Sequence, residues 1–246
     1  MPADFRLGIQ SYCFRKFRPL EPLIECLKAV GLKYVEIWPK HLPFEAEADE
    51  IRSSLATLAA NGISLESYGQ VSFDANQQQT RAVFEFAKLA GISAITADVA
   101  ADAVQVTDSL CQEYDINLAI HNHGRNHCYG TMAQLDELFA ATSKRFGICL
   151  DTAWMLDAGD DPLVAVERYA DRLYGVHLKD FVFDADSKPQ DVIIGTGGLD
   201  LPRLMKLLDD MDYTGYLSLE YEGNPKDPMD EVKACVQAVQ IAIAGL

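Results

Sequence analysis

The stretches Gly31-Leu32-Lys33-Tyr34-Val35, Gly62-Ile63-Ser64-Leu65 and Gly91-Ile92-Ser93-Ala94-Ile95 decide the fold that we expect for this sequence. Each places a glycine after a segment with helical periodicity and directly before a short apolar run. A glycine there is typical of the left-handed cap that ends a helix before a strand begins. Gly147-Ile148-Cys149-Leu150 repeats the pattern. The repeats lie about 25 to 35 residues apart, which is the length of one βα unit.

This pattern predicts eight strands that alternate with eight helices. The expected strands are residues 7–12, 34–38, 63–68, 94–98, 116–121, 146–151, 173–177 and 216–221. Alternating βα units require right-handed crossovers and a parallel sheet, and eight of them close into a barrel. We therefore predict a single (β/α)8 TIM barrel that forms one domain over residues 1–246. An open doubly wound sheet is the alternative, but the glycine-rich phosphate loop that usually follows its first strand is missing.

The composition limits the partners of the protein. Its formal net charge of -16 and pI of about 4.6 repel polyanions, and no basic cluster offsets them, so we expect no nucleic-acid partner. The sequence contains no apolar run close to the roughly 18 residues of a membrane span. Met1-Pro2-Ala3-Asp4 shows no export signal, and the 6 cysteines lack a CxxC motif, so we expect reduced thiols and a cytoplasmic location. The sequence leaves a homo-oligomer open.

Polar side chains end most of the predicted strands. In barrels of this class the active site lies at the carboxyl ends of the strands. Residues two apart share one face of a strand, so these side chains converge if that face points inward. The predicted strand ends carry Glu36 and Trp38, Glu66 and Tyr68, Asp98, His121 and His123, Asp151, His177 and Lys179, and Glu220 and Glu222.

Carboxylates and imidazoles gathered in one pocket repel each other or stay poorly solvated unless a cation neutralises them. We therefore predict one divalent metal ion held by His121, Asp151, His177 and Glu220, which end four consecutive strands. His123 is the alternative to His121. The mixed nitrogen and oxygen donors suit zinc, manganese, iron or cobalt better than calcium. The competing interpretation, in which every histidine is an ordinary hydrogen-bonded residue, must explain each strand end separately.

Other strand-end residues are candidate substrate contacts. Glu36 and Glu66 fit hydrogen bonds to a substrate as well as they fit hydrogen bonds within the rim. Aromatic side chains at a barrel mouth stack on sugar rings, although the same residues also fit a plain core. The aromatic candidates are Trp38, Tyr68, Trp154, Tyr12 and Phe14.

The stretch Gly195-Thr196-Gly197-Gly198 superficially resembles a nucleotide-binding loop. It lacks the third glycine of a GxGxxG motif, because Asp200 stands at that position. We therefore interpret the stretch as a turn before a helix that Asp200 caps.

Four motifs together are specific for one group of barrels. They are Leu118-Ala119-Ile120-His121-Asn122-His123-Gly124, Cys149-Leu150-Asp151-Thr152-Ala153-Trp154, Gly175-Val176-His177-Leu178-Lys179-Asp180 and Ser218-Leu219-Glu220-Tyr221-Glu222. With them the chain resembles, over essentially its whole length, the xylose isomerase-like barrel superfamily, often labelled sugar phosphate isomerase/epimerase. The superfamily includes inosose dehydratase, ketose 3-epimerases and endonuclease IV.

The resemblance also implies a ligand set. In related epimerases, Glu, Asp, His and Glu from strands five to eight hold the metal, which implies His121, Asp151, His177 and Glu220 here. His121 replaces a Glu that usually doubles as an acid or base, and Trp154 stands where many members carry a histidine. The segment His121-Asn122-His123 looks like that of inosose dehydratase-like branches and of enzymes acting on 3-keto sugars. Elimination therefore competes with isomerisation.

We predict a metal-dependent isomerase or epimerase that acts on a small keto sugar or cyclitol through an enediolate. Glu220 or Glu222 is the expected base, and His123 or Lys179 relays the proton or donates to the oxyanion. A metal-dependent lyase, or dehydratase, that expels a β-hydroxyl shares the first step and is the main alternative. A non-catalytic sugar-binding barrel is a minor one. Phosphodiester hydrolysis would need more than the 5 histidines present and a basic groove.

Overall fold

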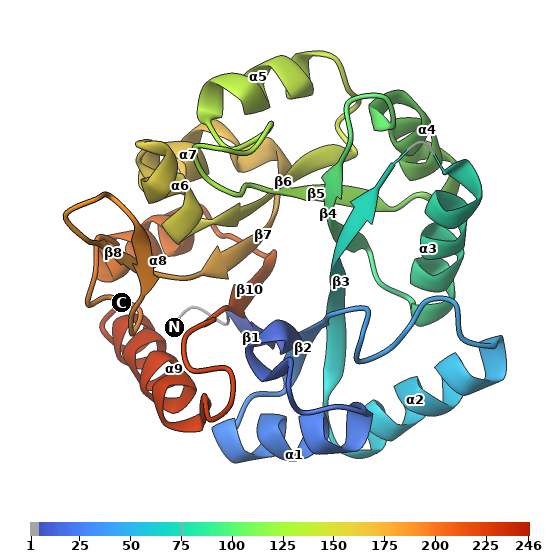
Figure 1. The fold of residues 1–246 in the computed structure, drawn as a ribbon, viewed down its shortest axis with the longest axis horizontal. Helices are drawn as coiled ribbons and strands as arrows, with labels where there is room; N and C mark the ends of the chain where they lie inside the picture. Colours follow the sequence, from blue (N-terminus) through green and yellow to red (C-terminus); the bar gives the residue numbers. More distant parts are fainter. Residues whose placement is uncertain (1–4, 75) are drawn as a thin grey trace.

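Eight parallel strands close into a barrel in the computed structural model, which describes residues 5–74 and 76–246 (Figure 1). Around the ring, β1 pairs with both β2 and β10, which closes the sheet. This confirms the predicted (β/α)8 barrel. Residues 1–4, on which the expectation of a cytoplasmic location partly rests, lie outside the described residues. The strands of the barrel are β1 (Arg6–Gln10), β2 (Tyr34–Ile37), β3 (Ser64–Phe73), β4 (Ala94–Val99), β5 (Asn117–His121), β6 (Phe146–Asp151), β7 (Leu173–Leu178) and β10 (Tyr216–Leu219).

Helices cover the outside of the barrel, where Figure 1 shows them as a ring around the strands. Helix α1 illustrates the predicted periodicity: Leu23 and Leu27 are fully buried, while Glu25 and Lys28 are exposed on its other side. In the described residues, no helix is both long and apolar enough to cross a membrane. The helices are α1 (Leu20–Val30), α2 (Ala48–Ala60), α3 (Gln77–Ala90), α4 (Val104–Tyr114), α5 (Met132–Ala140), α6 (Thr152–Ala158), α7 (Pro162–Arg168), α8 (Leu201–Asp210) and α9 (Met229–Ala244).

The repeated glycines have two different roles. Gly31 and Gly91 end α1 and α3 with φ of 75° and 71°, which confirms the predicted left-handed caps. Gly147 instead lies inside β6, so its predicted role as a helix cap is wrong. A Cβ on Gly147 would come 2.2 Å from the carbonyl oxygen of Arg172, so the glycine lets two neighbouring segments approach closely.

Several strands end a few residues from their predicted ends, and the first and third show the physical reasons. The first strand stops at Gln10 because the Gln10 side-chain oxygen accepts a hydrogen bond of 3.1 Å from the Tyr12 amide and starts the short helix η1 (Ser11–Phe14). The third strand continues to Phe73, five residues beyond the predicted end, because its register against β4 shifts after Tyr68 and pairing then resumes.

Two connections are also more elaborate than one helix each. Between β6 and β7 the chain forms both α6 and α7, because Gly159 ends the first with φ of 82° and Pro162 begins the second. After β7 an antiparallel hairpin, β8 (Phe181–Phe183) and β9 (Pro189–Asp191), precedes α8. The sequence pattern predicts neither feature.

The buried carboxylate of Asp180 organises the glycine-rich loop that follows this hairpin. It accepts hydrogen bonds from the amides of Gly195 and Gly197 at 2.9 and 2.8 Å. Asp200 then caps α8 by accepting a hydrogen bond from the Arg203 amide at 3.2 Å. The interpretation of residues 195–198 as a turn before a capped helix is therefore confirmed.

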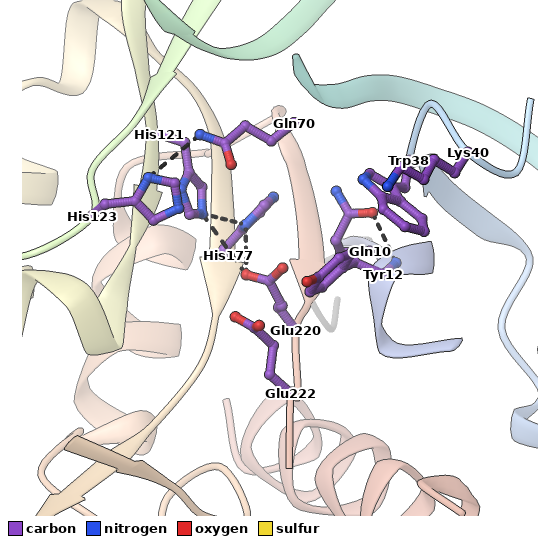
Figure 2. A pocket seen from close by; sticks show the side chains of 10 residues that line it. All are labelled: Gln10, Tyr12, Trp38, Lys40, Gln70, His121, His123, His177, Glu220 and Glu222. Atoms are coloured by element: carbon purple, nitrogen blue, oxygen red, sulfur yellow. Dashed lines mark hydrogen bonds and ion pairs between the residues drawn. The ribbon is translucent and has the colours of Figure 1, made fainter. Parts of the chain in front are cut away.

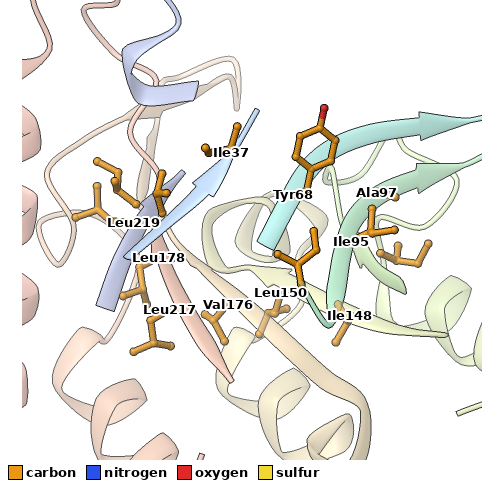
Figure 3. Packing of buried hydrophobic residues seen from close by; sticks show 14 of the residues in the cluster. Ile37, Tyr68, Ile95, Ala97, Ile148, Leu150, Val176, Leu178, Leu217 and Leu219 are labelled. Carbon is orange, nitrogen blue, oxygen red and sulfur yellow. The ribbon is translucent and has the colours of Figure 1, made fainter. Parts of the chain in front are cut away.

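The barrel is packed on both sides of its wall. Figure 3 shows apolar side chains such as Ile95, Val176 and Leu219 in the hydrophobic core. A separate small cluster of Ala94, Ala119, Cys149 and Tyr216 is also buried. The Tyr216 hydroxyl of β10 lies 2.7 Å from Thr96 Oγ1 of β4, a strand that does not pair with β10 in the barrel. Side chains thus fill the barrel and leave the strand ends as the place for a site.

A buried histidine fixes the segment that follows β2. His41 is 4% exposed, and its Nδ1 lies 3.0 Å from Ser11 Oγ, which in turn accepts a hydrogen bond from the Trp38 amide at 2.8 Å. These contacts tie η1 to the end of β2. Burial lowers the pKa of His41 to about 4, because the imidazolium would lose its solvation.

This lowered pKa predicts acid sensitivity. A histidine with a folded pKa below its unfolded value of about 6.5 stabilises the fold fully above that pH and loses its contribution as pH falls toward 4. We expect the His41→Gln variant to lose less stability over this interval than the wild type, by up to about 3 kcal/mol. Urea unfolding at several pH values measures the difference, and parallel curves for the two proteins would contradict it.

Candidate metal centre and active site

Four buried side chains meet where four neighbouring strands end. His121 ends β5, Asp151 ends β6, His177 lies next to the last residue of β7, and Glu220 directly follows β10. We call these four residues the tetrad. One ligand atom from each lies within 4.8 Å of the others. The structure thus brings together the set that the sequence predicts, with His121 rather than His123 as its first member.

The distances within the tetrad suit a shared cation. His121 Nε2 lies 2.9 Å from His177 Nδ1 and 3.4 Å from Asp151 Oδ2. Glu220 Oε2 lies 3.2 Å from His177 Nδ1 and 3.8 Å from His121 Nε2. Ligands on bonds of about 2.0 to 2.2 Å around one zinc-like ion are separated by roughly 3 to 4 Å. Figure 2 shows the two imidazoles and the Glu220 carboxylate turned toward one another.

An unpartnered oxygen tests the fit more sharply. Asp151 Oδ1 accepts a hydrogen bond of 2.8 Å from the Trp154 amide and so caps α6. Asp151 Oδ2 points into the tetrad and has no hydrogen-bond partner, although it is buried. A buried carboxylate oxygen without a partner is costly unless a cation or water satisfies it. The residues therefore fit a divalent metal ion.

Glu36 contacts the tetrad through the outer nitrogen of His177. Its Oε2 lies 2.7 Å from His177 Nε2, while His177 Nδ1 faces the other tetrad members. A carboxylate on the outer nitrogen of a metal-binding histidine fixes the ring orientation and raises the basicity of the inner nitrogen. Glu36 is 1% exposed, and it is not among the residues that line the pocket. The structure therefore places Glu36 in a contact with His177 and away from the cavity, where a substrate contact would lie.

A buried lysine lies beside the tetrad. Lys179 donates a hydrogen bond to Glu222 Oε1, and its Nζ lies 3.6 Å from Glu220 Oε2. Burial acts to lower the pKa of Lys179, but the carboxylates of Glu220, Asp151 and Glu222 outweigh it and raise that pKa. Burial likewise acts to raise the pKa of Glu220, while Lys179 and His177 hold it well below its usual range. Lys179 is thus a charged hydrogen-bond donor at the wall of the site.

The tetrad opens into a cavity of about 330 Å³. Tyr12 and Trp38 form one side of it, as Figure 2 shows. Their ring centroids lie 4.9 Å apart in an edge-to-face arrangement. Lys40 extends over the Trp38 ring, with its Nζ 5.1 Å from the centroid. The residues that line the cavity are Gln10, Tyr12, Trp38, Lys40, Gln70, His121, His123, His177, Glu220 and Glu222.

Two predicted substrate contacts lie elsewhere. Glu66 accepts a hydrogen bond of 2.7 Å from Arg6, which begins β1, so its carboxylate lies at the opposite end of the barrel. Tyr68 is fully buried, donates a hydrogen bond of 2.7 Å to the Leu42 carbonyl and packs on Phe86. Both expectations are wrong because β3 extends well beyond residue 68, so neither residue ends the strand.

Trp154 has a supporting place near the site. Its ring centroid lies 6.0 Å from that of His123 and 4.9 Å from that of Phe181. Lys179 Nζ lies 5.6 Å from the same ring centroid. Trp154 is not among the lining residues, so the predicted substrate contact is replaced by a contact with His123, which does line the cavity.

Three residues that line the cavity are not among those predicted from the sequence. Gln70 was not predicted because the expected third strand ended before the register shift that brings Gln70 to the cavity. Gln10 ends β1, and the strand-end rule would have selected it had the strand been ended correctly. Lys40 follows β2 in a loop, where strand periodicity gives no signal.

The chain belongs to the Xylose isomerase-like TIM barrel family, because the sequence profile of that family matches residues 24–239. It is similar to the rhizopine catabolism protein MocC of Rhizobium meliloti, with 30% identity over 131 residues that cover 46% of this chain and 39% of that protein. It is also similar to inosose dehydratase of Klebsiella pneumoniae, with 27% identity over 142 residues that cover 51% and 47%. The matches thus span less than half of each relative.

The fold is also that of a solved structure of the IOLI protein with a bound zinc atom. The TM-score is 0.78 at 14% sequence identity, and the alignment covers 98% of this chain and 99% of the other. At this identity the likeness concerns the fold alone. It agrees with the barrel derived above over nearly the whole chain.

The Glu36–His177 contact yields a prediction about metal affinity. The Glu36→Gln variant keeps the size of the side chain but removes the charge that orients His177. We expect its affinity for zinc or manganese to fall about 10-fold to 100-fold. Competition with a chromophoric chelator measures the affinity. The matched control is Glu66→Gln, at the far end of the barrel, which should bind as the wild type does; equal affinities in all three proteins would refute the positioning role.

Proposed function

We propose that this protein is a divalent-metal-dependent lyase that removes water from a small keto sugar or cyclitol. The proposal rests on one observation: Glu222 is the only glutamate outside the tetrad that lines the described cavity, and it lies on one side of it. Glu222 lines the cavity and is held by Lys179, whereas the strand-five position carries the imidazole of His121 instead of a second carboxylate. One proton acceptor on one side suits a reaction in which the same group takes a proton and returns it on the same face.

The tetrad would hold the metal ion in this proposal. Zinc, manganese, iron and cobalt all suit two imidazoles and two carboxylates. A divalent cation bound there supplies Lewis acidity that polarises a substrate carbonyl. The unpartnered Asp151 Oδ2 and the spacing of the donor atoms support this assignment.

Glu222 is the base in this proposal, and Glu220 is not. Glu220 Oε2 faces both tetrad histidines at 3.2 and 3.8 Å, which is the environment of a ligand. The Glu222 side chain is 31% exposed and reaches the cavity. Lys179 orients it through a charge-assisted hydrogen bond, which fixes one rotamer for proton transfer.

The elimination needs no further reactant. Glu222 takes the proton from the carbon beside the carbonyl, and the electron pair of that C–H bond moves into an enediolate. The C–O bond of the β-hydroxyl then breaks, the electron pair leaves with the oxygen, and Glu222 returns its proton to form water. The substrate loses one water molecule and becomes unsaturated, with no change in its overall redox state.

The shape of the cavity and the relatives support the substrate class. Tyr12 and Trp38 offer apolar ring surfaces beside polar groups such as the Gln70 amide, a combination that suits a polyhydroxylated ring. Inosose dehydratase, whose name describes removal of water from a cyclitol ketone, is among the similar proteins. Its matched segment includes only part of that protein, so it supports the proposal and does not replace it.

Isomerisation or epimerisation, which the sequence analysis ranks first, remains the second candidate because of one observation. His123 also lines the cavity, at a position apart from Glu222 in Figure 2. Inversion of a stereocentre needs a proton delivered to the face opposite the base, and an imidazole there would supply it. The two reactions share the first proton abstraction by Glu222.

The assignment of the base predicts the effect of one substitution. We expect Glu222→Gln to lower kcat by about 100-fold to 10,000-fold while substrate affinity changes little, because only proton transfer is removed. Turnover of inososes and 3-keto sugars by the metal-loaded protein, followed by NMR in deuterated water, measures both rate and product. The Glu66→Gln protein is the control for an unrelated carboxylate.

The product distinguishes the candidates. Loss of water supports the lyase, whereas a stereoisomer that carries deuterium supports the epimerase. A ligand bound without turnover in the wild type would indicate the minor alternative, a sugar-binding barrel, and a fully active Glu222→Gln variant would remove Glu222 from the mechanism.

A further inference from the structure

We propose that Asp98, His123 and His127 form a second binding site for a divalent transition metal at the rim of the barrel. We call these three residues the rim cluster. It shares no residue with the tetrad, and the inference does not depend on the reaction proposed above.

The rim cluster joins the end of β4 to the loop that follows β5. Asp98 Oδ1 lies 2.9 Å from His127 Nε2, and Asp98 Oδ2 lies 3.6 Å from His123 Nδ1. One ligand atom from each residue lies within 4.8 Å of the others. The three side chains are about a quarter exposed, so an ion can enter from solvent while the protein provides most of its surroundings.

The carboxylate of Asp98 is incompletely satisfied by its neighbours. Its Oδ1 is buried and has no partner in hydrogen-bonding geometry, although His127 Nε2 is only 2.9 Å away. The contact is close, but it lacks the geometry of a hydrogen bond. Such a close approach without hydrogen-bond alignment suits two adjacent ligands, which on one ion would move to a separation of roughly 3 to 4 Å.

The chemistry of the donors selects the ion. Two imidazoles separated by three residues, His123 and His127, together with one carboxylate from a neighbouring strand, suit zinc, cobalt or nickel and are poor ligands for calcium or magnesium. The Gln70 side-chain nitrogen lies 3.4 Å from His123 Nδ1, and a flip of the amide would turn the side-chain oxygen toward the rim cluster. The three ligands of the rim cluster leave further positions on the ion for Gln70, for solvent or for a substrate oxygen.

The two centres would be neighbours. The ring centroids of His121 and His123 lie 4.3 Å apart, and both rings line the same cavity. An ion in the rim cluster would take His123 out of proton transfer, because the nitrogen that faces Asp98 becomes a metal ligand. Occupancy of the rim site would thus leave Glu222 as the proton carrier and disfavour epimerisation.

Metal counting tests the inference without any measurement of activity. The full chain is stripped of metal, titrated with Zn²⁺ by calorimetry and assayed for bound zinc after gel filtration. Cys128 is exposed and directly follows His127, so every protein carries Cys128→Ser to exclude zinc on that thiol. We expect about two equivalents per chain in this background, and about one after either His127→Ala or Asp98→Asn. Asn126→Ala, an exposed change in the same loop, is the matched control.

A complementary variant separates this inference from the tetrad. Asp151→Asn should lose the tetrad equivalent and keep the rim equivalent, and Co²⁺ absorption spectra should show a different band for each site. The rim site is overturned if the Cys128→Ser protein binds about one equivalent that neither His127→Ala nor Asp98→Asn removes. It is also overturned if both of those variants keep two.

Discussion

Two imidazoles and two carboxylates buried around one point impose the constraint on which the rest of the site depends. Without a cation, the tetrad leaves Asp151 Oδ2 without a partner and sets two imidazole nitrogens 2.9 Å apart. The barrel makes this arrangement rigid, because each member ends or follows a different hydrogen-bonded strand. Glu36 fixes one ring from below, and Asn122 fixes Asp151 through hydrogen bonds of 2.8 and 3.0 Å between side chain and backbone. A divalent ion bound there would neutralise the two carboxylates and satisfy Asp151 Oδ2, which is the fit argued above.

The tetrad has carboxylates on one side and imidazoles on another, and the proposed chemistry depends on this difference. On one side, Lys179 lies among Glu220, Glu222 and Asp191, so the charge of a buried lysine is balanced by carboxylates. On another side, His123 and its neighbours offer imidazoles. Asp180, the residue after Lys179, holds the loop at residues 195–198 in place and thereby stiffens the segment that carries the lysine. The scaffold thus places Glu222, the carboxylate that we propose as the base, on one side of the tetrad.

The sequence predicts the barrel and the convergence of the four tetrad side chains for one physical reason. In a closed parallel barrel all carboxyl ends meet at one mouth, so polar residues at strand ends must converge, whatever the loops do. The same rule fails for Glu66 and Tyr68, because a register shift lengthens β3 and breaks the period of two on which the rule rests. It also misses the pairing of Asp98 with His127, which depends on the path of a loop. Contacts set by strand geometry are readable from sequence, whereas contacts set by bulges and loops need the structure.

Elemental analysis of the purified protein tests the central claim most directly. Plasma mass spectrometry of the wild type, Asp151→Ala and His177→Ala proteins, each reconstituted with the same metal, measures the ions that stay bound. The account predicts that each variant loses about one transition-metal ion per chain relative to the wild type. A wild type that binds no metal, or variants that keep the full complement, would contradict the metal centre and the chemistry derived from it.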